Sequence, residues 1–326
     1  MSDAVSETAP LPKLVVTIPA YNEEADVAAV IREIPRQIAG VGKVEVVVLD
    51  DGSTDSTVKV ALEAGADHVI SHKTQKGLAS SFRDAVREAL SRGGDIIVNT
   101  DADNHYDQSR IPDLIQPILD GRADITIGSR NITELPMRFI NKWGNIVGSA
   151  LVRTLAGLPA GIDVSTGFRA YTREAALGLH VISDHTYTHE TLIAAMEGGL
   201  TIVDVPIPAR VVTRPSRLIK GTISHIVRGL RVIIRSYAIY QPLRVFLTLA
   251  TVLIIAGMIP MIRFLILFLM DDGGGHIQSL IAGSVLLLVG FQVLILSLLA
   301  SSIAWNRKII EEILYRQRRR DYDSGE

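Results

Sequence analysis

Two carboxylates follow an apolar run in the segment at 95–103, which reads DIIVNTDAD. Residues 96–98 are typical of a buried strand, so Asp101 and Asp103 lie just past its end, where open α/β sheets bind their ligands. Side chains at positions i and i+2 of a tight turn can direct oxygen atoms at one point, and such oxygens suit Mg²⁺ or Mn²⁺. The spacing predicts a divalent metal site and, with it, a ligand that carries phosphate.

Alternating strands and helices are expected to position this pair. The apolar runs predict strands at 14–18, 44–49, 68–70, 96–98, 123–128 and 201–207, with helices from about residues 23, 55, 77 and 108. Strands built of nearly continuous Val and Ile indicate an α/β fold with a mostly parallel sheet between two helical layers. Pro206 interrupts the last strand, which suits a sheet edge. The first strand is followed by PAYNEE rather than a glycine fingerprint, which excludes a dinucleotide-binding dehydrogenase.

The C-terminal third is apolar enough to meet lipid. The whole chain of 326 residues is 48% hydrophobic, and the excess is concentrated at 245–270 and 277–305. Each segment exceeds the roughly 20 residues that span a hydrocarbon core, which predicts two transmembrane helices. Lys and Arg flank the pair on both outer sides and are missing from the connecting DDGGGH, so both termini are expected to be cytoplasmic. The absence of Cys excludes disulfides and thiolate chemistry, and fits a catalytic part that faces the cytosol.

Six motifs occur in order along the soluble part: PAYNEE at 19–24, DDGSTD at 50–55, KGLA at 76–79, DAD at 101–103, GSR at 128–130 and STGFRAY at 165–171. In this series residues 13–215 resemble family 2 glycosyltransferases, and among them the enzymes of the dolichyl-phosphate mannose synthase and polyprenyl-phosphate glycosyltransferase type. The resemblance implies a GT-A fold, which is Rossmann-like. It also implies a glycosyltransferase that depends on Mg or Mn.

The resemblance assigns the donor nucleotide sugar to the first four motifs. It implies that Asp51 and the PAYNEE loop hold the base and ribose, while a turn cap is the alternative role for Asp51. Lys76 lies where a cation near the donor is expected, although a solvated surface lysine remains open. The full expected donor set is Pro19, Tyr21, Glu23, Asp51, Lys76, Gly77, Asp101, Ala102 and Asp103.

His105 departs from the family pattern, in which a glutamine at this position helps to bind the metal. A neutral imidazole can also bind Mn, so the expected metal ligands are Asp101, Asp103 and His105. The alternative for His105 is a polar neighbour of the sugar or an exposed loop residue.

Arginines are expected to receive a second phosphate, that of a lipid acceptor. The resemblance implies contacts from Arg130 in GSR and from Arg138 on the following helix, with Arg130 counted as catalytic together with the two aspartates. Lys142 shares a helix face with Arg138, since residues four apart are neighbours, and a solvated face remains the alternative for both. For Arg169 two roles are expected equally: a contact with the acceptor phosphate, or bracing of the GFRAY turn. Arg214 completes the expected set.

The remaining segments complete the predicted organisation. Residues 1–12 read as a disordered leader, 216–241 as an interfacial amphipathic helix, 242–305 as the membrane pair and 306–326 as a basic cytoplasmic tail. The resemblance implies an integral membrane enzyme that transfers a hexose with inversion from a nucleotide sugar to dolichyl or polyprenyl phosphate. GDP-mannose is the first expected donor and UDP-glucose the second. A processive polysaccharide synthase and a non-catalytic scaffold are the alternatives. Nucleic acid is not an expected partner, and a homo-oligomer is left open.

Overall fold

The computed structural model describes residues 10–130, 162–179, 181, 187–208, 210, 241–270 and 277–323. The chain forms two compact units, one of residues 1–231 with 314–326 and one of residues 232–313. Arg138, Lys142, Arg214 and nearly all of the expected amphipathic helix at 216–241 lie outside the described residues.

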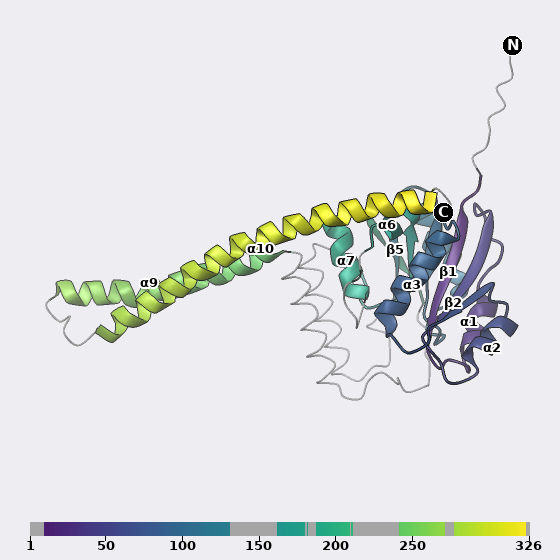
Figure 1. Ribbon diagram of the computed structural model, residues 1–326, viewed down its shortest axis with the longest axis horizontal. Helices are drawn as coiled ribbons and strands as arrows, with labels where there is room; N and C mark the ends of the chain where they lie inside the picture. Colours follow the sequence, from purple (N-terminus) through teal and green to yellow (C-terminus); the bar gives the residue numbers. More distant parts are fainter. Residues whose placement is uncertain are drawn as a thin grey trace, which may run out of the picture. The chain divides into compact units, whose positions relative to one another are not determined.

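A seven-stranded mixed sheet forms the centre of the first unit (Figure 1). Its strands are β1 (Lys13–Ala20), β2 (Lys43–Asp50), β3 (His68–Ser71), β4 (Ile96–Asn99), β5 (Ile125–Ser129), β6 (Arg169–Thr172) and β7 (Ile202–Pro206). They lie in the order β3-β2-β1-β4-β6-β5-β7, and β6 runs antiparallel to both of its neighbours. The other pairs are parallel, so β1, β2 and β4 end at the same edge of the sheet.

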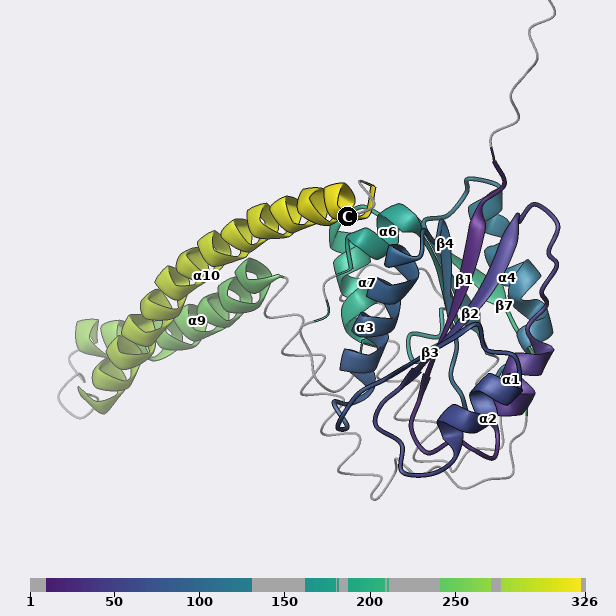
Figure 2. The same cartoon turned by 45° about the vertical axis from the view of Figure 1, so that its right-hand side comes forward.

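Helices cover both faces of this sheet. They are α1 (Val27–Glu33), α2 (Thr57–Glu63), α3 (Leu78–Ser91), η1 (Gln108–Arg110), α4 (Ile111–Leu119), α6 (Arg173–Leu177) and α7 (Thr188–Glu197). Figure 2 shows α3, α6 and α7 on one face and α1, α2 and α4 on the other. Strand residues such as Val15 and Val16 have no exposed surface, because alternate side chains meet opposite helical layers.

The predicted alternation of strands and helices is confirmed, including β7 at an edge of the sheet. Strand β6, the antiparallel strand between β4 and β5, was not among the predicted strands. This strand has four residues and begins with an arginine, so its composition does not resemble that of a buried strand. Its presence makes the sheet mixed and brings the STGFRAY turn next to the end of β4.

Two helices in the second unit are long and apolar enough to cross a membrane: α9 (Pro242–Leu269) and the part of α10 (Ile277–Asp323) that precedes residue 314. They approach closely at two glycines, since a Cβ on Gly283 would lie 2.9 Å from the carbonyl oxygen of Gly257. Helix α10 continues well beyond the expected span end at residue 305. Strong helix formers and the Arg307–Glu311 pair, at 2.6 Å, support this extension.

The last turns of α10, from residue 314, belong to the first unit and pack on α6. Arg318 donates from Nη1 to the carbonyl oxygens of Leu177 and Leu179, at 3.1 and 3.0 Å. In the other direction, Nη2 of Arg173 donates to the carbonyl oxygen of Tyr322 at 3.2 Å. Each helix therefore supplies an arginine to carbonyl groups near the C-terminal end of the other, which are groups that a helix itself leaves unpaired.

Candidate active site

The loops after β1 and β2 are held together by hydrogen bonds. The amide of Asn22 donates to Oγ of Ser53, and the amide of Thr54 donates to Oδ1 of Asn22, both at 2.8 Å. Asn22 has a φ of 54°, which asparagine tolerates better than most residues. These bonds fix the backbone around Tyr21, a residue that follows β1 directly, is 39% exposed and can contact a ligand.

The other expected residues of these loops have different surroundings. Pro19 is buried within β1, one residue before its end, and pairs with Leu49 of β2. Glu23 is half-buried, and its amide donates to Oγ1 of Thr57 at 2.8 Å. Of the three expected residues of this loop, Tyr21 is the exposed one and offers surface to a nucleotide.

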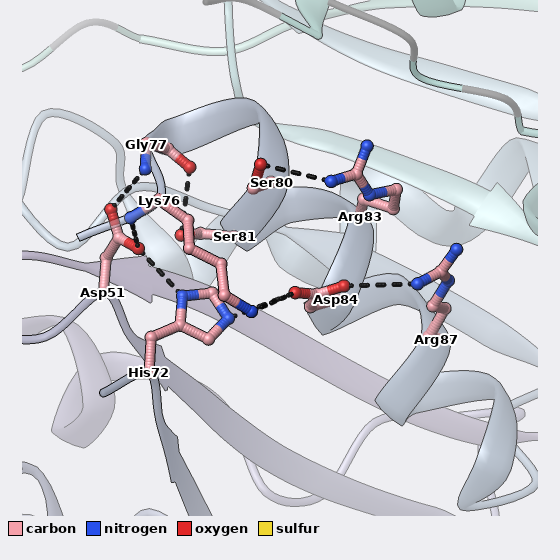
Figure 3. Close-up of polar contacts among 9 residues, drawn as sticks. All are labelled: Asp51, His72, Lys76, Gly77, Ser80, Ser81, Arg83, Asp84 and Arg87. Atoms are coloured by element: carbon pink, nitrogen blue, oxygen red, sulfur yellow. Dashed lines mark hydrogen bonds and ion pairs between the residues drawn. The ribbon is translucent and has the colours of Figure 1, made fainter. Parts of the chain in front are cut away.

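Asp51 organises the loop that carries Lys76 and Gly77 (Figure 3). Its Oδ1 accepts from the amide of Lys76 at 2.9 Å, and its Oδ2 accepts from the amide of Gly77 at 2.8 Å. Nδ1 of His72 lies 2.8 Å from the same Oδ1. Burial raises the pKa of Asp51, but these hydrogen bonds outweigh it and hold the pKa below its ordinary value. Both oxygens of Asp51 thus hold the loop at Lys76 and Gly77, while the turn bond from the amide of Ser53 goes to Asp50; a contact between Asp51 and the donor stays a prediction.

His72 was missed by the sequence analysis, although it holds this region together. Its Nε2 lies 3.1 Å from Oδ2 of Asp84, so the ring bridges a loop carboxylate and a carboxylate of α3. Lys76 reaches the same Asp84 oxygen at 3.4 Å with a half-exposed side chain. A single histidine in a polar loop gives no signal in the sequence, because its partners come from two other segments.

Asp101 and Asp103 follow β4 as expected, and Ala102 between them is buried. Burial and the charge of Asp103 raise the pKa of Asp101 to about 7, against the opposing effects of Arg130 and His105. The carboxylates of Asp101 and Asp103 therefore lie so close together that it is unfavourable for both to carry a negative charge. A divalent cation relieves this repulsion, so the pair fits a metal held by two carboxylates and completed by substrate phosphates.

His105 contacts one of the two aspartates. Its Nδ1 lies 2.7 Å from Oδ2 of Asp103, and this contact with Asp103 raises the pKa of His105. In the part of the chain that the structure describes, no group of three His, Asp or Glu side chains is arranged to hold a metal. In this geometry the imidazole of His105 pairs with Asp103, and the three-residue metal set of Asp101, Asp103 and His105 stays a prediction.

The STGFRAY turn packs against Asp101 through Gly167. Nδ2 of Asn99 donates to the carbonyl oxygen of Gly167 at 2.8 Å and to the hydroxyl of Tyr187 at 2.9 Å. A Cβ on Gly167 would lie 2.7 Å from Oδ1 of Asp101, closer than real contacts allow. The missing side chain at this position therefore leaves room for the Asp101 carboxylate.

Arg130 extends from the end of β5 toward the aspartate pair. Its Nε donates to Oδ2 of Asp163 at 2.9 Å, and its guanidinium carbon lies 5.5 Å from the centre of the Tyr106 ring. Burial opposes its charge, but Tyr106, Asp163 and Asp101 raise the pKa of Arg130 above its ordinary value. The side chain stays 15% exposed, so a permanently charged group lies at the surface beside Asp101.

Arg169 takes the bracing role rather than the phosphate-binding one. It has no exposed surface, and its guanidinium donates to the carbonyl oxygens of Thr166, Thr188 and Val164 and to Oγ1 of Thr191. With these donors used inside the protein, the expectation of a contact between Arg169 and the acceptor phosphate is not met. The residue joins the turn before β6 to the start of α7.

Replacing Arg169 by lysine should lower stability without changing the use of any substrate. An ammonium group cannot reach acceptors spread around a planar guanidinium, and leaving several buried oxygens unpaired costs about 3 kcal/mol or more. Thermal unfolding of Arg169→Lys and of the surface control Arg122→Lys tests this. A normal melting temperature together with a raised KM for one substrate would contradict the bracing role.

Comparison with known proteins places these features in context. Residues 15–177 match the family model described as Glycosyl transferase family 2. A dolichyl-phosphate hexose transferase of Haloferax volcanii is 34% identical over 199 residues, which cover 60% of this chain and 82% of the relative. A polyprenol monophosphomannose synthase of Mycolicibacterium smegmatis is 29% identical over 210 residues, covering 61% and 77%.

A solved structure shares the fold. Glucosyl-3-phosphoglycerate synthase of Mycobacterium tuberculosis, in complex with Mn²⁺, UDP-glucose and phosphoglyceric acid, superposes with a TM-score of 0.54 at 22% identity. The superposition covers 68% of this chain and 79% of that one. The sheet and its helices are thus of the GT-A type, as the motifs predicted.

Proposed function

Since the chain belongs to glycosyl transferase family 2, and is therefore a glycosyltransferase, we propose that it transfers a hexose from a nucleotide sugar to polyprenyl or dolichyl phosphate. The reaction inverts the anomeric centre and gives a β-linked lipid-phosphate sugar. GDP-mannose is the first candidate donor and UDP-glucose the second. The observation that carries the proposal is that the carboxylate expected to bind a metal, Asp101, lies close enough to the largely buried, permanently charged guanidinium of Arg130 for each to shift the pKa of the other.

The donor side would use the aspartate pair. Asp101 and Asp103 would hold Mg²⁺ or Mn²⁺ against the pyrophosphate of the donor, and the ion would stabilise the charge that develops on the leaving nucleoside diphosphate. Tyr21 and the backbone of the joined loops after β1 and β2 would receive the nucleoside. Asp51 contributes by fixing the amides of Lys76 and Gly77.

The acceptor side would use Arg130. A lipid monophosphate has a second pKa near ~6 and is already largely dianionic at neutral pH, so its oxygen attacks without a strong general base. The requirement is then to position this dianion beside the anomeric carbon. Arg130 keeps a permanent charge next to Asp101, and it provides that positioning.

Helices α9 and α10 support a membrane location for the acceptor. Both expose large apolar side chains along their length, among them Leu265 and Leu288, as expected of lipid-facing helices. The Lys and Arg residues on the outer sides of the pair favour an orientation with both termini in the cytoplasm. A lipid phosphate would then reach the site from the cytoplasmic leaflet.

The decisive experiment is a product analysis with the purified full-length protein. Polyprenyl phosphate, a panel of nucleotide sugars and Mg²⁺ or Mn²⁺ are incubated with it, and the organic extract is weighed by mass spectrometry. The proposal expects one hexose added to the lipid phosphate and loss of the product with a chelator. A water-soluble polymer would indicate a processive synthase, and no product with any donor would indicate a non-catalytic scaffold.

Replacing Arg130 by alanine should weaken use of the lipid acceptor more than binding of the nucleotide sugar. A hydrogen bond to a charged group contributes ~2 kcal/mol, so the acceptor KM should rise about 30-fold. The surface variant Arg110→Ala serves as control, since the Arg110 side chain is half-exposed and pairs with Asp113, three residues further along the chain. Equal losses for donor and acceptor would instead assign Arg130 to the ion pair with Asp163.

A further inference from the structure

Tyr106 is only 2% exposed and interacts with Asp101, with Arg130 and with the STGFRAY turn. Its position gives no signal in the sequence, because a tyrosine three residues after the DAD motif resembles any core aromatic. Its hydroxyl and its ring face different partners. The two ends of the side chain can therefore be considered separately.

The hydroxyl group of Tyr106 connects the STGFRAY turn with the carboxylate of Asp101. The amide of Gly167 donates to the hydroxyl oxygen at 3.1 Å. Since that oxygen accepts from an amide, its own proton is available for an acceptor, and a hydrogen bond from Tyr106 acts on Asp101 to lower its pKa. One oxygen atom thus links the backbone at Gly167 to the carboxylate that packs against it.

The ring supports the guanidinium of Arg130. The guanidinium carbon lies 5.5 Å from the ring centre, within the range of a cation–π contact. The ring also stacks on Phe168 of the STGFRAY turn, with centres 5.2 Å apart and planes inclined by 17°. Arg130 and Asp101 are therefore held relative to each other through one rigid side chain with two rotatable bonds.

We propose that Tyr106 is a positioning residue that sets the Asp101 carboxylate through its hydroxyl and the Arg130 guanidinium through its ring. It touches neither substrate. It would fix the spacing between the donor pyrophosphate and the acceptor phosphate. The rate of transfer between two bound anionic substrates depends on this spacing. This inference rests on the proposed function, in which Asp101 serves the donor and Arg130 the acceptor.

Two substitutions separate the two ends of the side chain. Tyr106→Phe removes the hydroxyl and keeps the ring, whereas Tyr106→Leu removes both. Tyr171→Phe is the matched control, since Tyr171 is similarly buried in the same unit and the groups that act on its hydroxyl, Arg169 and Thr191, are not those expected to hold the metal. The readouts are Mn²⁺ binding by electron paramagnetic resonance with GDP or UDP present, the KM for polyprenyl phosphate, and the melting temperature.

Tyr106→Phe should weaken Mn²⁺ binding about tenfold, as expected when a residue that orients a metal ligand is lost, and leave the acceptor KM within about twofold. Tyr106→Leu should weaken Mn²⁺ binding equally and also raise the acceptor KM about fivefold. Tyr171→Phe should change neither. A purely structural role for Tyr106 would lower the melting temperature and the activity without this split between donor and acceptor.

The outcomes that overturn the inference are distinct from those that overturn the proposed function. Unchanged Mn²⁺ binding in Tyr106→Phe, or an unchanged acceptor KM in a folded Tyr106→Leu, excludes the positioning role while wild-type transfer stands. A wild-type protein that neither binds Mn²⁺ with a nucleotide nor transfers a sugar excludes the proposed function, and this inference with it. If Tyr106→Leu does not fold, Tyr106→Phe decides alone.

Discussion

Replacing Asp101 by asparagine is expected to abolish sugar transfer and, in the metal-free protein, to raise the melting temperature. The loss should be about 10³-fold or more, because a metal ion that neutralises a leaving diphosphate contributes several kcal/mol to the rate. The gain in stability follows from the raised pKa of Asp101, about 7 in place of 3.8. An asparagine keeps the shape and removes the buried charge.

Because the pKa of Asp101 is higher in the folded protein than in the unfolded chain, the stability of the fold depends on pH. Between about pH 4 and pH 7 the unfolded chain has already released the Asp101 proton while the folded protein still holds it, so stability falls as pH rises through this window. Above pH 7 the fold bears the full unfavourable charge. The advantage of Asp101→Asn should therefore be small near pH 4 and largest near pH 8.

Thermal unfolding in detergent at several pH values, with a chelator present, measures this advantage. Adding Mn²⁺ and a nucleoside diphosphate should stabilise the wild type and leave Asp101→Asn nearly unchanged, since the variant lacks a ligand. An advantage of equal size at pH 5 and pH 8 would show that the Asp101 charge is not its source. Retained transfer in the variant would remove Asp101 from the metal site.

Replacing Gly167 by alanine is expected to reduce turnover about 100-fold, since a displacement of about 1 Å at a reacting centre has effects of this size. The added methyl group would lie 2.7 Å from Oδ1 of Asp101 and 2.8 Å from the hydroxyl of Tyr187. Tyr187 is buried and its hydroxyl accepts from Nδ2 of Asn99, so the half-buried carboxylate of Asp101 is the neighbour that must move. Gly167 is not among the residues with positive φ, which makes the effect steric.

Gly178→Ala is the matched control. Its added methyl would have its nearest contact at 3.5 Å, an ordinary distance, and its φ of −80° suits alanine. Steady-state rates at increasing Mn²⁺ concentration should show that the Gly167 variant needs more metal than the wild type. A Gly167 variant with normal turnover and normal metal demand would mean that Asp101 has room to shift without loss.

The sequence predicted the parts of the fold that depend on local patterns. Apolar runs located β1, β2 and β4, and the parallel arrangement of those strands brought their carboxyl ends together. The two carboxylates past β4 could be identified for the same reason. By contrast, β6 begins with Arg169, and only the carbonyl groups of distant segments make an arginine acceptable there.

The contacts that complete the site could not be predicted in the same way. Tyr106 meets the amide of Gly167 across 61 positions, and Asn99 meets Tyr187 across 88. His72 bridges Asp51 and Asp84, which lie on different elements. Such neighbours are set by tertiary packing rather than by any period in the sequence. The GFRAY motif likewise made Arg169 a candidate for the acceptor phosphate, but nothing in the sequence indicated that its side chain would be buried.

The reciprocal arginine contacts between α6 and α10 bear on how this enzyme can be divided for study. The catalytic unit is built from two separate stretches of chain, and the second follows the apolar helices. A water-soluble fragment cut before α9 would lose Arg318, and the carbonyl groups at the end of α6 would lose their donor. A soluble enzyme should therefore keep residues 314–323, rejoined through a flexible linker in place of the apolar helices, and its affinity tag belongs at the N-terminus.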